Sequence, residues 1–211
     1  MRNKLFFLAL IATMMVSCES TQQVTGSYVN KEALPEKAFK KVFIMVMAHK
    51  DAPRAIIENQ LADAARKRGI ETVLSADVFP IGYFGQKPDK KAVANEIMKH
   101  GCDAVFTVTL LHEETQERYV PGTIAAPYMV YPFYSSYYSY FDYRYSYVYD
   151  PGYYTSEKIY FIEGLLYDLN TEKLLWSLQS KSYDPGTLAN FGKTYADLVF
   201  YQLRKEGLVE K

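Results

Sequence analysis

The sequence predicts an α/β fold with a single mixed β-sheet and helices packed on it. An apolar run of strand length fills residues 41–48, and two segments with helical periodicity follow it. Two further segments of strand length, 158–169 and 173–183, flank a short turn. Uninterrupted apolar runs are typical of strands that are covered on both faces. We therefore expect a β-α-β-α-β unit, then a β-hairpin and a C-terminal helix, within one domain over 38–211.

The β-α-β-α-β unit follows from capping residues and periodicity. The helix after the first strand has Asp51 as its expected N-cap, and a second strand is predicted over 70–75. A second helix, capped by Asp89, precedes a third strand that begins at 102. Right-handed crossovers place these three strands parallel. We expect the first strand to lie between the other two.

The second half of the chain completes the sheet. The turn 170–172 joins the runs 158–169 and 173–183 into a hairpin, which we expect in the same sheet. An apolar stripe at helical spacing predicts a C-terminal helix over 187–206. This helix is expected to cover one face of the sheet.

The N-terminus has the organisation of an export signal. Arg2 and Lys4 precede an apolar run over 5–16, which is interrupted only by Thr13. A bilayer-spanning helix needs roughly 17 to 25 apolar residues, so this run is too short to remain as a span. We expect residues 1–17 to be a signal peptide that is removed.

Cys18 follows the signal directly. The stretch Met15-Val16-Ser17-Cys18 resembles the lipobox of bacterial lipoproteins. The resemblance implies a diacylated Cys18 that anchors the chain in a membrane, and Glu19 after it favours the outer membrane, facing the periplasm. The alternative is a disulfide between Cys18 and Cys102 in an oxidising compartment. Residues 18–37 are polar and aperiodic, which predicts a flexible tether with a reach of about 20 to 25 Å.

The charge balance excludes one class of partner. Removing Arg2 and Lys4 leaves 22 Lys and Arg against 24 Asp and Glu, a formal charge of minus two. The sequence has no basic stripe or run of Lys and Arg. We expect no nucleic-acid partner.

Three stretches carry a resemblance to a known group: RAIIENQLADAARKRG, GCDAVFTVTL and FIEGLLYDLNTEKLLWS. The shared pieces are Gly101-x-Asp103-Ala104-Val105 and the hairpin Tyr167-Asp168…Thr171-x-Lys173…Trp176. They resemble the small α/β domain of bacterial envelope lipoproteins and their relatives: the TolB amino-terminal domain, the curli-secretion lipoprotein and the penicillin-binding-protein activators. The resemblance covers about residues 40–114 and 157–208. It implies a non-catalytic role in binding or scaffolding at the cell envelope.

A tyrosine-rich segment, residues 128–154, lies within an insertion over about 115–156 and holds 12 Tyr in 27 positions. Five of its rings alternate on one side of an extended chain and amount to roughly 1,000 Å² at about 150 to 250 Å² each. Such a patch exceeds what isolated domains expose. One possibility is that the tyrosine-rich segment folds back on the domain or forms a low-complexity loop. The other is that the segment recognises an envelope protein, a glycan or a second copy of the chain. The five candidate partner-binding residues are Phe141, Tyr143, Tyr145, Tyr147 and Tyr149.

Catalytic motifs are absent from the sequence. It contains no GxGxxG, GxxxxGK, GxSxG or CxxC, and Gln116 stands where an HExxH motif beginning at His112 would need its second His. We expect no cofactor and no enzymatic activity. The alternative is a metal-dependent hydrolase, because neighbouring strand ends would bring His49 and Asp51 near His112 and Glu113.

Overall fold

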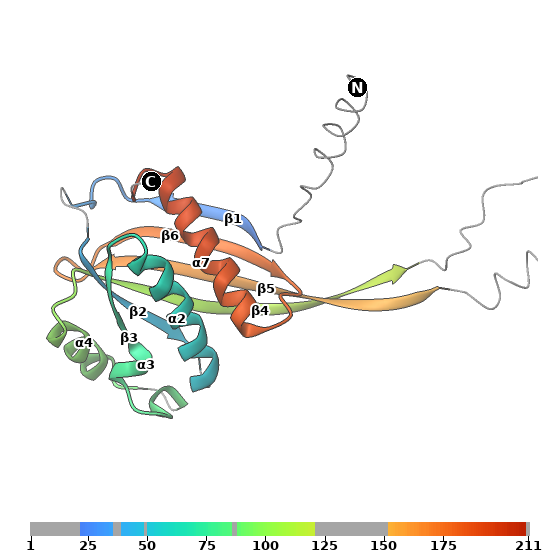
Figure 1. The fold of residues 1–211 in the computed structure, drawn as a ribbon, viewed down its shortest axis with the longest axis horizontal. Coiled ribbons are helices and arrows are strands. Elements are labelled where there is room, and N and C mark those ends of the chain that lie inside the picture. The colour runs from blue at the N-terminus through green and yellow to red at the C-terminus, as the bar shows by residue number, and fades with distance from the viewer. Residues whose placement is uncertain (1–21, 36–38, 49, 86–87, 121–151, 210–211) are drawn as a thin grey trace, which may run out of the picture.

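The computed structural model describes residues 22–35, 39–48, 50–85, 88–120 and 152–209. These residues form one open, mixed sheet of six strands in the order β1-β6-β5-β4-β2-β3, with helices packed on it (Figure 1). The predicted α/β class is confirmed. The elements are β1 (Gln22–Val29), β2 (Lys41–Met47), α2 (Asp51–Arg66), β3 (Glu71–Leu74), α3 (Ser75–Val78), η1 (Tyr83–Gly85), α4 (Lys90–Lys99), β4 (Ala104–Val120), β5 (Tyr153–Asp168), β6 (Leu174–Tyr183) and α7 (Leu188–Lys205).

The parallel part of the sheet has the predicted order. β2 lies between β3 and β4 and is parallel to both. The side chain of Asp89 caps α4 by accepting a hydrogen bond from the backbone N of Lys91, as predicted. The capping role expected of Asp51 is wrong, because Asp51 is the first residue of α2 and its carboxylate binds elsewhere.

The antiparallel part begins with the predicted hairpin of β5 and β6. Asp168 shapes its turn, because its Oδ1 accepts hydrogen bonds from the backbone N of Asn170 at 3.0 Å and of Thr171 at 2.7 Å. α7 begins after Thr187, whose side chain accepts a hydrogen bond from the backbone N of Asn190. The predicted C-terminal helix is therefore confirmed.

The flexible tether expected over 18–37 is wrong for residues 22–29. They form β1, an edge strand antiparallel to β6 in which Gln22 pairs with Ser182 and Val29 with Trp176. An edge strand keeps one side in solvent, so its sequence is largely polar. Backbone pairing with a distant strand, which polarity does not reveal, orders this segment.

Two apolar cores fill the space between the sheet and its helices. The larger core lies under α2 and α7, which pack side by side on one face, and includes the fully buried Trp176 and Tyr195. The smaller core lies on the other face and joins Phe43, Met45 and Val105 to Ile97 of α4. Within the described ranges, no helix is both long and apolar enough to cross a bilayer.

Candidate functional site

Two paired strands project from the sheet and form the first candidate site. β4 and β5 continue as a pair beyond the other strands, from Thr115↔Lys158 to Val120↔Tyr153 (Figure 1). Among the described residues, no third strand pairs with these six positions. We call residues 115–120 and 153–158 the ribbon. At about 3.3 Å per residue it extends roughly 20 Å from the sheet.

Polar contacts connect the ribbon to the sheet at its base. Lys158 Nζ donates a hydrogen bond to Glu113 Oε1 at 2.7 Å, and this partner raises the pKa of the lysine. A register shift between Leu110 and His112 follows the last pair of β4 with β2, Met47↔Thr109. His112 stacks on Phe161 with ring centroids 3.9 Å apart. These contacts hold the ribbon where it leaves the sheet.

The outer end of the ribbon is aromatic. Tyr119 and Tyr154 are cross-strand partners whose ring centroids lie 5.2 Å apart. Their exposed fractions are 45% and 72%, and Tyr153 on the next pair is 63% exposed. Gly152, which directly precedes Tyr153, has φ 81°. A Cβ added at Gly152 would lie 2.6 Å from the Tyr119 hydroxyl. The end of the ribbon therefore needs glycine at this position.

The ribbon forms the two described ends of the insertion that contains the tyrosine-rich segment. Tyr153 and Tyr154 belong to β5, so both described ends of the expected insertion over 115–156 are paired strands. This pairing was not predicted from the sequence. The five predicted partner-binding residues lie outside the described residues: Phe141, Tyr143, Tyr145, Tyr147 and Tyr149.

The alternative considered for the strand ends, a metal cluster, is not assembled by the described residues. β4 does not end near His112 but continues to Val120, and the last pair between β2 and β4 is Met47↔Thr109. Asp51 instead accepts hydrogen bonds from Arg54 at 2.9 Å and from the backbone N of Gly82 at 2.8 Å.

The other members of that cluster are engaged elsewhere or lie outside the structure. Glu113 pairs with Lys158, and His112 Nε2 lies 3.3 Å from Glu114 Oε1. His49 lies outside the described residues. In the part of the chain that the structure describes, no three His, Cys, Asp or Glu side chains are grouped to hold a metal.

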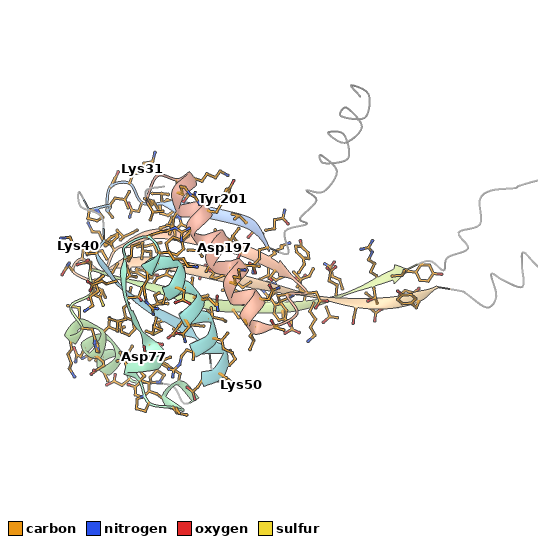
Figure 2. The ribbon with its side chains drawn as sticks, in the orientation of Figure 1. Lys31, Lys40, Lys50, Asp77, Asp197 and Tyr201 are labelled. Atoms are coloured by element: carbon orange, nitrogen blue, oxygen red, sulfur yellow. The ribbon has the colours of Figure 1, made fainter. Side chains whose placement is uncertain are left out.

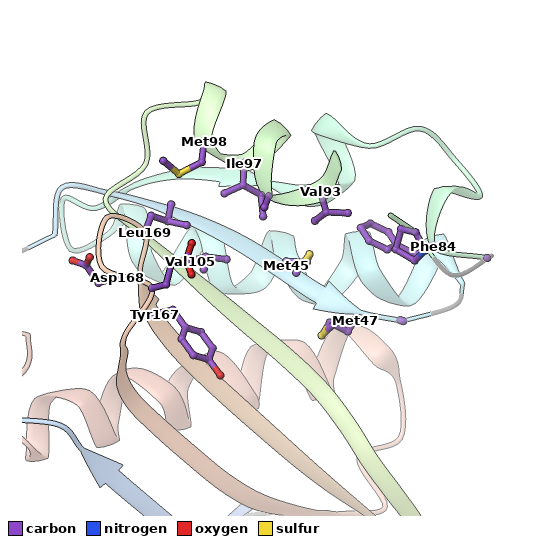
Figure 3. A pocket seen from close by; sticks show the side chains of 15 residues that line it. Met45, Met47, Phe84, Val93, Ile97, Met98, Val105, Tyr167, Asp168 and Leu169 are labelled. Atoms are coloured by element: carbon purple, nitrogen blue, oxygen red, sulfur yellow. The ribbon is translucent and has the colours of Figure 1, made fainter. Parts of the chain in front are cut away.

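An apolar groove forms the second candidate site (Figure 3). It lies between α4, the segment around η1 and the smaller-core face of the sheet, with a volume of about 730 Å³. Met47 and Met98 on its wall are 55% and 54% exposed. Sequence reasoning missed this groove, although the alternation of Phe43, Met45 and Met47 signals a second apolar face. The apolar lining is Met45, Met47, Phe84, Val93, Ala94, Ile97, Met98, Val105, Tyr167 and Leu169.

The polar groups at the groove do not form a catalytic arrangement. Asp168 and Glu172 are its two carboxylates. One oxygen of Asp168 is already engaged by the hairpin turn, where it also accepts a hydrogen bond from Thr171 Oγ1 at 2.9 Å. The described lining can therefore bury apolar groups, and within it no nucleophile lies beside a base.

A buried carboxylate of α2 has a structural role. Glu58 is fully buried, and it accepts hydrogen bonds from the backbone N of Val46 and of Ala76, both at 2.8 Å, and from Ser75 Oγ at 2.5 Å. Burial raises the pKa of Glu58. Because all three donors belong to β2 and α3, the carboxylate joins these elements to α2.

Cys102 is a free thiol of intermediate exposure, and its partial burial raises the pKa of the thiol. Cys18 lies outside the described residues. The anchoring of the chain at Cys18 therefore stays a prediction.

Comparisons with known proteins find similarity only among solved structures. No protein-family model and no curated protein matches the chain. The PelC dodecamer from Paraburkholderia phytofirmans is 13% identical over 86% of this chain and 96% of that chain, with a TM-score of 0.45. Lipoprotein GNA1162 from Neisseria meningitidis is 13% identical over 80% of this chain and 99% of that chain, with a TM-score of 0.40.

A PDZ domain protein from Parabacteroides distasonis is 12% identical over 90% of this chain and 38% of that chain, with a TM-score of 0.41. These scores and identities assign no activity, partner or location to this chain.

Proposed function

We propose that this protein is a non-catalytic lipoprotein of the bacterial cell envelope, anchored through Cys18 in the outer membrane and facing the periplasm. Its role is to bind or scaffold a partner through the tyrosine-rich segment. The ribbon is the observation that carries the binding role. At its outer end, Val120 and Tyr153 flank residues 121–152 roughly 20 Å beyond the sheet, away from the two cores.

The chemistry of the segment suits recognition of another molecule. Tyrosine supplies a large, rigid contact area with a hydroxyl tip at a low cost in conformational entropy. Residues 128–154 also contain Ser and Gly, whose hydrogen bonding is adaptable. An envelope protein or a glycan fits this chemistry, and a second copy of the chain would give a homo-oligomer.

Lipidation is tested by labelling the bacterial host with radioactive palmitate and comparing the wild type with Cys18→Ala. We expect label in the wild-type chain, recovered with the outer membrane, and no label in the variant. Cys102→Ala is the matched control and should incorporate palmitate normally. A wild-type chain that stays unlabelled, or a Cys18–Cys102 disulfide in the mature protein, would contradict the proposal.

Partner binding is tested by placing a photoreactive amino acid at Tyr143 and irradiating intact cells. We expect one crosslinked species that is resolved by mass spectrometry. The control carries the same amino acid at Tyr201, which is 57% exposed on α7. Equal crosslinking from both positions, or none from Tyr143, would argue against recognition through the segment.

A further inference from the structure

The first residue of β1 and the base of the ribbon lie at the same end of the sheet. Gln22 pairs with Ser182, Ser182 with Tyr160, and Tyr160 with Glu113. β1 then runs away from the ribbon toward Val29 (Figure 1). The chain therefore enters the sheet beside the point where the ribbon leaves it.

The connection from Cys18 to this point is short. Only Glu19, Ser20 and Thr21 separate Cys18 from Gln22. Four residue steps span at most about 14 Å when fully extended. A lipidated Cys18 would therefore hold Gln22 within about 14 Å of the headgroups, closer than the reach of about 20 to 25 Å expected for a longer tether.

This limit excludes one orientation of the body. If the ribbon pointed away from the membrane, the end of β1 at Val29 would have to lie between Gln22 and the lipid. Gln22 and Val29 are seven steps apart, which is roughly 23 Å along a strand. That length does not fit into a gap of about 14 Å. The ribbon end must face the bilayer, or the sheet must lie along it.

The outer end of the ribbon has the chemistry of a lipid interface. Its last three pairs contain no carboxylate, and Arg118 is their only charged residue. Tyrosine concentrates at membrane interfaces, where the ring meets the apolar boundary and the hydroxyl meets the headgroups. Three pairs span about 10 Å, comparable to the 5 to 10 Å that interfacial segments bury. Glu117 and Glu157 lie one and two pairs further back and remain in water.

We propose that, in the lipidated protein, Tyr119, Tyr153 and Tyr154 at the end of the ribbon enter the headgroup layer of the membrane that holds Cys18. The inference rests on the proposed lipid anchor and adds a second contact with the same surface. Within the ribbon, the charges of Glu117 and Glu157 balance those of Arg118 and Lys158. The contact therefore needs no anionic lipid.

The experiment uses the mature lipidated protein in vesicles of phosphatidylcholine. A polarity-sensitive fluorophore is attached at Tyr154→Cys in a Cys102→Ser background, and a second preparation carries it at Tyr153→Cys. The control is Lys31→Cys, because Lys31 is exposed at the opposite end of the body (Figure 2). We expect a several-fold rise in emission with a blue shift at 153 and 154, and quenching there by a headgroup nitroxide lipid. The label at 31 should show neither change.

Palmitate content is measured on the same samples, so the two proposals fail in different ways. A palmitoylated protein whose labels at 153 and 154 stay in water would overturn the ribbon contact and leave the anchor intact. Quenching at 31 in place of 154 would also overturn it, because the body would then be inverted. A chain without palmitate would overturn the anchor and, with it, the contact.

Discussion

The carboxylate of Glu206, directly after α7, accepts a hydrogen bond from the indole Nε1 of Trp176 in β6. It also accepts hydrogen bonds from Ser27 Oγ of β1 at 2.5 Å and from Gln202 Nε2 at 2.7 Å. Because Trp176 is fully buried, its indole N–H needs such an acceptor. One carboxylate thus joins the last helix to the two strands at the edge of the sheet.

Glu206→Gln should destabilise the fold by about 1 to 3 kcal/mol at neutral pH, because hydrogen bonds to a charged acceptor are lost. Burial alone would raise the pKa of Glu206, but the hydrogen bonds from Ser27, Gln202 and Trp176 outweigh it and lower the pKa below 4.5. A lowered pKa in the folded state gives stability above pH 4.5 that is lost as the pH falls through the folded value.

Urea unfolding of the wild type and Glu206→Gln between pH 3 and pH 8 measures this effect. The difference in unfolding free energy should be largest near neutral pH and should shrink as the pH falls below 4.5. Glu71→Gln, at an exposed position of β3, is the matched control. A difference that stays constant over the whole pH range would contradict the role given to the Glu206 charge.

Glu58→Ala should destabilise the fold by about 3 kcal/mol or more. The substitution leaves the backbone N of Val46, the backbone N of Ala76 and the hydroxyl of Ser75 without their acceptor, and each such loss costs about 1 to 3 kcal/mol. Equilibrium unfolding in urea measures the loss. Asn59→Ala, one residue further on and exposed, should cost less than about 1 kcal/mol. Equal losses for both variants would contradict the structural role of Glu58.

The pH dependence of the wild type offers a separate test of Glu58. Burial raises its pKa above the ordinary value of 4.5. A group with a raised folded-state pKa contributes stability that is complete below its unfolded value and is lost as the pH rises through the folded value. We expect the carboxyl resonance of a ¹³C-labelled Glu58 to titrate above pH 4.5. A midpoint at or below 4.5 would show that the three hydrogen bonds outweigh burial.

Gly164→Ala should destabilise the fold by about 1 to 3 kcal/mol through overpacking. An added Cβ at Gly164 would lie 2.6 Å from the Tyr195 hydroxyl and 3.0 Å from Cζ of Phe106. Tyr195 is fully buried, and within the described ranges its hydroxyl has no hydrogen-bond partner. Tyr195→Phe alone should therefore be neutral or stabilising, because it removes an unsatisfied polar atom.

A double-mutant cycle of Gly164→Ala and Tyr195→Phe measures the contact. The double variant should be more stable than the sum of the two single effects predicts, because the nearest clashing atom is gone. Gly26→Ala is the control, since its Cβ would meet only Gln179, at 3.9 Å. Strict additivity would show that the close approach of the hydroxyl to β5 has no energetic effect.

Replacing residues 121–152 by Asn-Gly should leave the folded body stable. Val120 and Tyr153 are cross-strand partners, and a two-residue Asn-Gly turn closes such a pair. The two cores lie wholly within residues on either side of the replaced segment. Thermal unfolding followed by circular dichroism should shift by no more than a few degrees. A large fall in the melting temperature would support the alternative in which the tyrosine-rich segment folds back on the domain.

Local patterns in the sequence were sufficient for most of the architecture. The apolar run at 41–48, the turn at 170–172 and the stripe over 187–206 predict β2, the β5–β6 hairpin and α7. Periodicity and capping chemistry act within a few residues, so they can be read from the sequence. The helix that follows Asp89 was predicted from the same kind of local pattern.

Features that depend on distant partners could not be read in this way. Gln22 and its neighbours were expected in a tether because their polarity resembles that of a linker, while pairing with Ser182 makes them an edge strand. His112 was expected at a strand end, but β5 accompanies β4 to Val120 and extends the strand. The apolar groove exists because α4 packs near β2, and the sequence alone did not show this packing.

By itself the sequence determined the α/β class and the order of the main elements from β2 to α7, and it predicts the leader that precedes Cys18, because these depend on composition and short periodicities. Only the tertiary structure decided that the chain enters the sheet beside the base of the ribbon. It also decided that, among the described residues, Asp51 and Glu113 accept hydrogen bonds from Gly82 and Lys158 and belong to no metal-binding group. Those relationships depend on pairing and packing between segments that are distant in the sequence, such as Gln22 and Ser182, which local chemistry does not specify.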